Sequence, residues 1–139
     1  MGLNWLHDNK DFTENDIGDN YGFVYLITNT ITGKKYVGKK FFYSMKTKVL
    51  KGKKKRYKTQ SDWQTYYGSN TELQNDVILH GKEAFKREII HLCKSRGETN
   101  YMEAYYQFTE GVLLREDNYN GIIQIKLGKN SVKDLKVTK

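Results

Sequence analysis

The sequence has little that would cross-link it or hold it in a membrane. Cys93 is the single cysteine among 139 residues. One cysteine excludes a disulfide framework and a cysteine-based zinc site, and it fits a reducing compartment. The chain also has no run of about 18 apolar residues, the length needed to span a bilayer. We therefore expect a cytoplasmic protein with no membrane partner.

Acidic residues are missing from one long stretch. Residues 34–58 hold 12 of the 24 lysines and arginines and no aspartate or glutamate. This stretch therefore carries +12, while the remaining residues, 12 basic and 16 acidic, sum to −4 and leave a net charge of +8. Clustered basic side chains gain affinity for polyanions by displacing the counterions that condense on phosphates. The pattern favours a nucleic acid as the partner.

The rest of the chain has enough apolar residues to bury a core, with 37% hydrophobic and 14% aromatic residues. β-Branched and aromatic residues dominate 22–28 and 35–42, and turn residues lie between them, so we predict a β-hairpin. Gly52, between two charged segments, predicts a second hairpin or a flexible loop. Capping residues and apolar spacing predict a small α+β domain with further elements. These are helices over 61–67, over 70–81 and from Thr99, a strand over 85–93, and a strand or docked segment over 122–125.

Strand periodicity brings together two tyrosines of the first hairpin. If residues 25 and 36 pair directly, or with a slip of two residues, Tyr25 and Tyr36 share one face, and Lys40 joins them beyond Gly38. A phosphodiester could approach the backbone at the bare glycine, while the ammonium favours a phenolate or a phosphate oxygen. The alternative is that both tyrosines are ordinary strand residues.

The same residues carry a family resemblance. Phe23-Val24-Tyr25 and, ten residues later, Tyr36-Val37-Gly38 resemble the paired motif of the GIY-YIG nucleases, with Phe in place of the first glycine and Val in place of isoleucine. The downstream order resembles that of phage homing endonuclease catalytic domains: Asn70 to Gln74, His80-Gly81 with Phe85, Tyr101-Met102-Glu103, and Tyr119-Asn120.

The resemblance implies a fold and an activity. The fold is a small three-stranded mixed or antiparallel β-sheet flanked by helices. The activity is a Mg²⁺-dependent (or Mn²⁺-dependent) hydrolysis of DNA that leaves 5′-phosphate and 3′-hydroxyl ends. We expect a nuclease domain over residues 22–125 with a basic insertion over 43–60, an N-terminal arm over 1–21 and a basic tail over 126–139. A standalone phage or mobile-element enzyme is implied, acting in a bacterial cell or phage-infected host.

Carried over residue by residue, the resemblance assigns the site. Tyr25 and Tyr36 form the tyrosine pair, one of which helps to deprotonate the attacking water. Glu103 is the metal ligand, and Asn120 positions the phosphate or orders the site. A single carboxylate suffices for Mg²⁺, which keeps several waters. The alternative for Glu103 is that it only stabilises the dipole of its helix.

The family's helix arginine is missing. Alignment on Trp63 places Asp62 at the arginine position, with Tyr66 and Tyr67 where the family has histidine or tyrosine. Counting from Gly38 instead reaches Lys46, inside the basic insertion. We therefore expect another cation to stabilise the transition state, with Lys40 as the first choice and Arg56 as the second. A lysine lacks the bidentate geometry of arginine. This departure keeps open a non-catalytic nucleic-acid-binding or repair accessory module on the same fold.

The basic insertion is expected to bind DNA, most readily double-stranded, by following the backbone or by entering a groove as a two-stranded ribbon. A homo-oligomer on DNA and an RNA target remain alternatives, because attraction to phosphate does not distinguish the sugars. The expected DNA-binding residues are Lys46, Lys48, Lys51, Lys53, Lys54, Lys55, Arg56 and Lys58.

Overall fold

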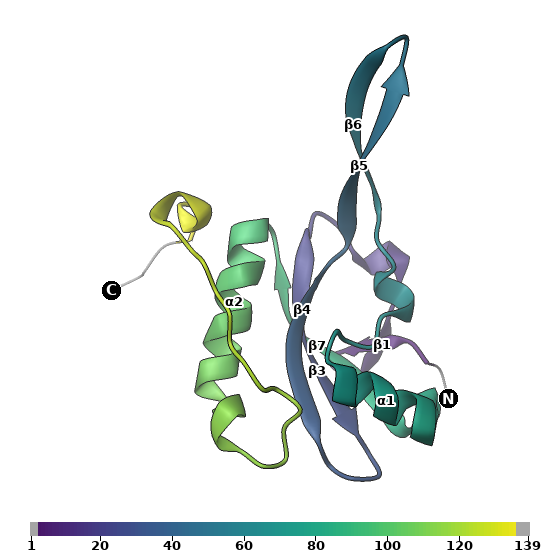
Figure 1. Cartoon of the computed structure of the whole chain (residues 1–139), viewed down its shortest axis with the longest axis vertical. Helices are drawn as coiled ribbons and strands as arrows, with labels where there is room; N and C mark the ends of the chain where they lie inside the picture. The colour runs from purple at the N-terminus through teal and green to yellow at the C-terminus, as the bar shows by residue number, and fades with distance from the viewer. Residues whose placement is uncertain (1–2, 136–139) are drawn as a thin grey trace.

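The first long hairpin forms the centre of the sheet. A computed structural model describes residues 3–135 (Figure 1). In it, β3 (Gly22–Asn29) and β4 (Lys35–Phe41) pair antiparallel. The Asn29 side chain accepts hydrogen bonds from the backbone N–H groups of Ile31 and Thr32, which stabilises the turn between the strands. The predicted hairpin is confirmed.

The register of this hairpin decides which side chains share a face. Tyr25 lies opposite Gly38, and Ile27 lies opposite Tyr36, so the strands are offset by two residues from direct pairing of the tyrosines. Strand β7 (Phe85–Cys93) pairs antiparallel with the other edge of β3. An even offset preserves side-chain parity, so Tyr25, Tyr36 and Lys40 lie on one face, as predicted.

The sheet is larger than predicted. It has five strands in the order β2-β1-β7-β3-β4, because β1 (Trp5–His7) and β2 (Lys10–Phe12) extend it beyond β7. β1 pairs parallel with β7, which makes the sheet mixed. The three-stranded prediction therefore counts only β7, β3 and β4. The predicted N-terminal arm contains both of these strands, which the sequence did not reveal because three-residue strands are too short to show an alternating pattern.

Two of the three predicted helices are present in the described residues, one with nearly the predicted bounds and one with an earlier start. Helix α1 (Thr71–His80) begins as predicted, with the Asn70 side chain accepting from the Leu73 N–H at 2.9 Å. Helix α2 (Arg96–Thr109) begins earlier than predicted, because Ser95 rather than Thr99 caps it. Residues 61–67 contain only a 3₁₀ turn over Trp63–Thr65.

Of the two alternatives predicted for residues 122–125, the structure has the docked segment. These residues form no strand, and Ile123 packs on the core. Other 3₁₀ turns in the described residues are Glu14–Asp16, Lys82–Ala84, Val112–Leu114 and Lys129–Val132. Residues 1–2 of the predicted arm and 136–139 of the predicted tail lie outside the described residues.

The two faces of the sheet bury different cores. Figure 1 shows α1 and α2 on opposite sides of the sheet. The α1 side is aromatic and contains Trp5, Phe23, Tyr25, Phe42 and Trp63, whereas the α2 side contains Val24, Val37, Cys93 and Val112. The rings pack edge-on or tilted, as in the Trp5–Phe23 and Phe42–Trp63 pairs. These cores hold β3 and β4 rigidly between the helices.

The basic segment folds as a hairpin that stands apart from the sheet. β5 (Tyr43–Leu50) and β6 (Lys53–Gln60) pair antiparallel in a two-stranded sheet of their own. Lys51 and Gly52 both have positive φ, as a type I′ two-residue turn requires. At the base, the Ser61 hydroxyl donates to the Phe41 carbonyl at 2.6 Å. The hairpin projects along the long axis of the molecule (Figure 1).

Candidate active site

Three tyrosines gather on the α1 side of the central hairpin. The ring centroid of Tyr25 lies 6.1 Å from that of Tyr36 and 6.0 Å from that of Tyr66. The Tyr25 side chain is buried, whereas Tyr36 and Tyr66 are half-buried. The Tyr36 hydroxyl lies 3.3 Å from the Ser69 Oγ. Strand parity and the turn before α1 thus bring together three of the predicted site residues.

Gly38 makes room for this cluster. A Cβ atom built at Gly38 would lie 2.4 Å from the Tyr25 hydroxyl and 2.9 Å from the Tyr36 ring. Gly68 approaches from the other side, since a Cβ there would lie 3.5 Å from both tyrosines. The tyrosine side chains occupy the space that a side chain at position 38 would need. This explains why the second motif ends in glycine.

The phenols are held in their neutral form. Burial raises the pKa of Tyr25 well above its ordinary value, and nearby Tyr66, Tyr36 and Glu103 raise it further. Burial also raises the pKa of Tyr36, while its hydrogen bond with Ser69 acts in the opposite direction. Near neutral pH both groups are therefore hydrogen-bond donors as well as acceptors.

Lys40 lies on the same face but has a carboxylate partner. Its Nζ is 2.6 Å from the Asp62 Oδ1 and 4.1 Å from the centroid of the Tyr66 ring. The hydrogen bond from Lys40 lowers the pKa of Asp62. Asp62, which aligns with the family's arginine, therefore binds Lys40, the cation that we predicted to replace that arginine.

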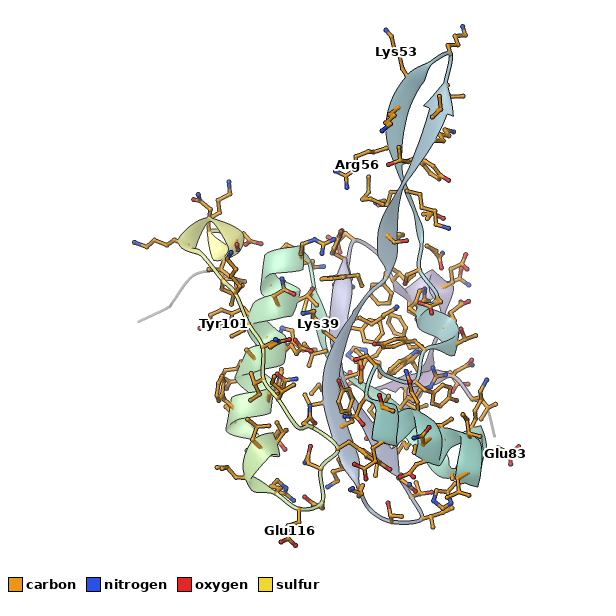
Figure 2. The ribbon with its side chains drawn as sticks, viewed as in Figure 1. Lys39, Lys53, Arg56, Glu83, Tyr101 and Glu116 are labelled. Atoms are coloured by element: carbon orange, nitrogen blue, oxygen red, sulfur yellow. The ribbon has the colours of Figure 1, made fainter. Side chains whose placement is uncertain are left out.

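Arg56, the second choice for that cation, lies elsewhere. Figure 2 shows Arg56 on the projecting hairpin, away from the sheet. It pairs with Thr47 in the middle of β5 and β6, and both residues are exposed. Within the described residues β5 and β6 pair with each other and with no other strand, and their hairpin projects from the sheet (Figure 1), so Arg56 does not lie at the tyrosine cluster.

Glu103 approaches from the opposite side of the sheet. It lies on α2, and its side chain is 16% exposed. Its Oε1 is 3.3 Å from the Nζ of Lys39, which points from β4 toward α2 (Figure 2). Burial raises the pKa of Glu103, and the ammonium and backbone N–H of Lys39 oppose that rise. The charge of Glu103 also raises the pKa of Tyr25 and Tyr36.

Asn120 closes the outer edge of β4. Its Oδ1 accepts from the Val37 N–H at 3.0 Å, and its Nδ2 donates to the Val37 carbonyl at 2.9 Å. The Gln107 side chain donates to the same carbonyl at 3.1 Å. The side-chain amide thus replaces a neighbouring strand at this point. Of the two predicted roles for Asn120, this contact fits the ordering of the site.

Some site residues were missed from the sequence. Lys39, Gln107 and Ser69 were not assigned to the site. Strand parity places Lys39 on the face opposite Lys40, which is the face toward the helix that carries Glu103. This parity was the one signal in the sequence for a pairing of Lys39 with a carboxylate. The contacts of Gln107 and Ser69 join distant parts of the chain and leave no local pattern.

Other polar clusters lie away from the tyrosines. The potential ligand atoms of His91, Cys93 and Glu98 lie within 4.8 Å of one another. Each also has a structural partner: Glu98 accepts from the Lys94 N–H at 2.7 Å, the His91 Nδ1 lies 3.3 Å from the Tyr106 hydroxyl, and the Cys93 thiol donates to the His91 carbonyl at 3.8 Å. Burial raises the pKa of Cys93 to about 12. These contacts explain the cluster as the junction of β7 with the start of α2.

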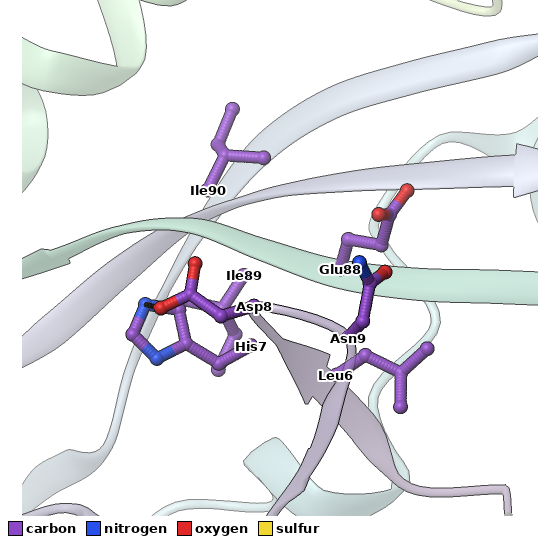
Figure 3. A pocket seen from close by; sticks show the side chains of 7 residues that line it. All are labelled: Leu6, His7, Asp8, Asn9, Glu88, Ile89 and Ile90. Atoms are coloured by element: carbon purple, nitrogen blue, oxygen red, sulfur yellow. Dashed lines mark ion pairs between the residues drawn. The ribbon is translucent and has the colours of Figure 1, made fainter.

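A surface hollow of about 310 Å³ lies beside the N-terminal strands. Figure 3 shows it between the β1–β2 turn and β7, with His7 and Asp8 forming a 3.9 Å pair on one side. Its lining consists of Leu6, His7, Asp8, Asn9, Glu88, Ile89 and Ile90. None of the predicted site residues contributes to it.

A family model described as putative endonuclease segE, GIY-YIG domain, matches residues 5–123. The chain belongs to the GIY-YIG nuclease family. The match includes β1 and β2, in agreement with their place in the sheet of this GIY-YIG domain. The domain supports nuclease activity with DNA as the substrate. Neither the curated proteins nor the solved structures contained a match. Within residues 3–135, no helix of this GIY-YIG protein is long and apolar enough to cross a membrane.

Proposed function

We propose that this GIY-YIG protein is a Mg²⁺-dependent or Mn²⁺-dependent DNA endonuclease that leaves 5′-phosphate and 3′-hydroxyl ends. The observation that carries the proposal is the arrangement around Gly38, with tyrosine phenols on one side of β4 and a carboxylate on the other. We further propose an enzyme of the phage or mobile-element type, supported by the resemblance to homing endonucleases.

The tyrosines have distinct roles in this proposal. Tyr25 is buried, with a pKa raised well above its ordinary value, so it donates a hydrogen bond to a phosphate oxygen and remains neutral. Tyr36 is more exposed, and its contact with Ser69 favours loss of its proton. Once it has lost its own proton to solvent, Tyr36 is therefore the better candidate to accept a proton from the attacking water.

Lys40 is the proposed cation for the transition state. In the free protein its ammonium binds Asp62, whose side chain is 70% exposed. A phosphate at the tyrosine face would replace this carboxylate as the anionic partner of Lys40, and Asp62 would return to solvent. Tyr66, whose ring lies beneath the ammonium, holds Lys40 beside the site in either state.

Glu103 fits a hard divalent cation. It offers carboxylate oxygens, the ligands that Mg²⁺ prefers. Its side chain is mostly buried beside β4, the strand that carries Gly38 and Lys39. The Lys39 ammonium at 3.3 Å shows that the position favours positive charge. Glu103 would therefore hold the metal ion, which when bound would stabilise the charge that develops on the leaving 3′ oxygen. Asn120 keeps the β4 edge in place beside it.

The test is nicking of supercoiled DNA by the wild type and by Glu103→Gln, each with Mg²⁺ and with a chelator. Cleavage should require Mg²⁺ and should fall at least about 100-fold in Glu103→Gln, because the metal would lose its protein ligand. Glu110→Gln, at the end of the same helix, is the matched control and should cleave normally. Nicks that DNA ligase seals without further treatment would establish the proposed ends. Metal-dependent nicking that survives Glu103→Gln would overturn the ligand assignment.

A non-catalytic nucleic-acid-binding or repair accessory module is the second candidate. The Lys40–Asp62 contact of 2.6 Å favours it, because the carboxylate occupies the cation proposed for the transition state. Asp62→Asn distinguishes the two functions. If the protein is an enzyme, releasing Lys40 should preserve or increase cleavage. Absence of cleavage by folded wild type and by Asp62→Asn on supercoiled, linear and branched DNA would favour the binding module.

A further inference from the structure

The hairpin of residues 43–60, here called the β5–β6 ribbon, holds the entire excess charge of the protein. Eight of the 24 basic residues lie in it, and no acidic residue does. The other 16 basic residues are balanced by the 16 acidic residues of the chain. Between Met45 and Tyr57 every residue is exposed, and within residues 3–135 the ribbon pairs with no other strand.

Basic side chains cover both faces of this ribbon. Residues directly opposite each other in an antiparallel pair share a face, and the faces alternate along each strand. The register pairs Thr47 with Arg56 and Lys48 with Lys55. One face therefore carries Lys54, Arg56 and Lys58, and the other carries Lys46, Lys48, Lys53 and Lys55.

The charges do not compensate one another within the ribbon. Lys48 and Lys55 lie directly opposite, an arrangement that destabilises a strand pair through like-charge repulsion. Lys48 lies 5.0 Å from the Tyr57 ring centroid, and Lys58 lies 4.4 Å from that of Tyr43. The tyrosines orient two of the ammonium groups but do not neutralise them. Only an anionic partner on each face would do so.

The dimensions of the ribbon match one feature of duplex DNA. Eight residues per strand at about 3.3 Å each make a ribbon roughly 25 Å long. The major groove of B-form DNA, about 12 Å wide, admits a two-stranded ribbon, whereas the minor groove, about 6 Å wide, is too narrow. Figure 2 shows Lys53 near the tip and Arg56 farther down, so basic groups are spread along the ribbon.

Contact with a single phosphate backbone would leave one charged face in solvent. In the major groove, phosphates lie on both sides. Exposed apolar side chains give a second reason to place the ribbon in the major groove, because Met45, Val49 and Leu50 are 43%, 66% and 49% exposed. Thymine presents its methyl group in the major groove only, where such side chains can contact it.

We propose that the β5–β6 ribbon enters the major groove of B-form duplex DNA, so that side chains of both faces contact phosphates. The proposal rests on the proposed function for its partner, the DNA substrate, but it concerns binding and not cleavage. Duplex RNA is disfavoured as a partner, because its deep and narrow major groove does not admit such an element.

The experiment measures fluorescence anisotropy of a labelled 30-base-pair duplex in chelator, across a range of salt concentrations, so that no cleavage occurs. Two triple variants are compared, Lys54→Gln/Arg56→Gln/Lys58→Gln and Lys46→Gln/Lys48→Gln/Lys55→Gln. Each removes three charges from one face. Both should weaken binding by similar factors, and each should reduce the slope of log K against log salt by about 2.7. A loss confined to one triple variant would show contact with a single backbone and overturn the proposal.

Two further duplexes test the groove. Bulky substituents on C5 of the pyrimidines fill the major groove and should weaken binding by the wild type, whereas a minor-groove ligand should not displace it. Unchanged binding to the C5-substituted duplex together with displacement by the minor-groove ligand would overturn the proposal. Equal affinity for duplex RNA would also overturn it. The Glu110→Gln protein, changed outside both the ribbon and the candidate site, should bind like the wild type. Binding without cleavage by the wild type would contradict the proposed nuclease function and leave the ribbon proposal supported.

Discussion

At the scale of single residues, two buried groups give the candidate site its shape without carrying its chemistry. Gly38 leaves the space that the phenols of Tyr25 and Tyr36 occupy. Arg87 lies beneath the site, 3% exposed, and its guanidinium donates to the carbonyls of Leu3, Gln64 and Tyr66. A buried cation bonded to carbonyls ties the first residues of the chain to the loop that presents Tyr66.

Gly38→Ala should disturb the candidate site while the domain still folds. The added Cβ would lie 2.4 Å from the Tyr25 hydroxyl, so the phenols must shift. We expect cleavage to fall more than about tenfold and the free energy of unfolding to fall by about 1–3 kcal/mol, as in overpacked cores. The measurements are nicking rate and urea unfolding. Gly128→Ala, where a Cβ meets nothing within 4 Å, is the control. Unchanged nicking by Gly38→Ala would show that the phenols tolerate displacement.

Arg87→Met should destabilise the whole domain. Methionine fills the space between the Trp5 and Tyr67 rings but leaves three carbonyls without their donor. Because these buried carbonyls would be unsatisfied, we expect the free energy of unfolding, measured in urea, to fall by roughly 2–5 kcal/mol. Lys86→Met, on the neighbouring and exposed position of β7, should change stability by less than about 1 kcal/mol. Equal effects of the two changes would contradict a structural role for Arg87.

At the scale of elements, the β1–β2 hairpin and the β5–β6 ribbon contribute in opposite ways. β1 and β2 bring Trp5 and Phe12 into the aromatic core, and the Trp5 indole N–H donates to the Trp63 carbonyl at 2.7 Å. The β5–β6 ribbon contributes length and charge, and most of its residues bury nothing. One hairpin therefore supports the fold, and the other is available for a partner.

Removal of the ribbon should leave the domain folded. Tyr43 and Gln60 are direct partners, so residues 44–59 can be replaced by Asn-Gly, a two-residue type I′ turn. Because nearly all of the deleted residues are exposed, we expect the melting temperature to change by no more than about 5 °C. Affinity for duplex DNA should fall, together with its dependence on salt. A ribbon of the same length with all eight basic residues changed to Gln is the control for charge. Unfolding of the shortened protein would contradict the independence of the ribbon.

At the scale of the whole molecule, buried ionisable groups make stability depend on alkaline pH. Burial raises the pKa of Cys93 from 9.0 to about 12, and it raises the pKa of Tyr25 and Tyr36 above 10.0. The unfolded chain therefore loses these protons at lower pH than the native protein. Where the unfolded state binds fewer protons, the free energy of unfolding decreases as pH increases.

We expect stability in urea to decline from about pH 9, by about 1.4 kcal/mol per pH unit for each group that ionises only in the unfolded chain. The Cys93 contribution should be lost between about pH 9 and 12. Cys93→Ala should lack the part of the decline that begins near pH 9 while keeping the part from the tyrosines above pH 10. Wild-type stability that stays constant from pH 7 to 10.5 would contradict these directions.

Much of the central fold and tyrosine face could be predicted because the signals are local. Alternation along 22–28 and 35–42 predicted β3 and β4, and parity placed Tyr25, Tyr36 and Lys40 on one face. The short strands β1 and β2 could not be predicted, because three residues define no period and their stability comes from Trp5 packing on distant rings. The start of α2 was misplaced because Ser95 and Thr99 are both suitable caps.

By itself, the sequence determined where the charge lies and which tyrosines share a face, because both follow from neighbouring residues and the period of a strand. Only the tertiary structure decided that Lys39 pairs with Glu103, that Lys40 pairs with Asp62, and that the basic hairpin projects from the sheet. These features depend on contacts or orientations that join distant segments. Their free energies arise only once the chain has folded around both faces of the sheet.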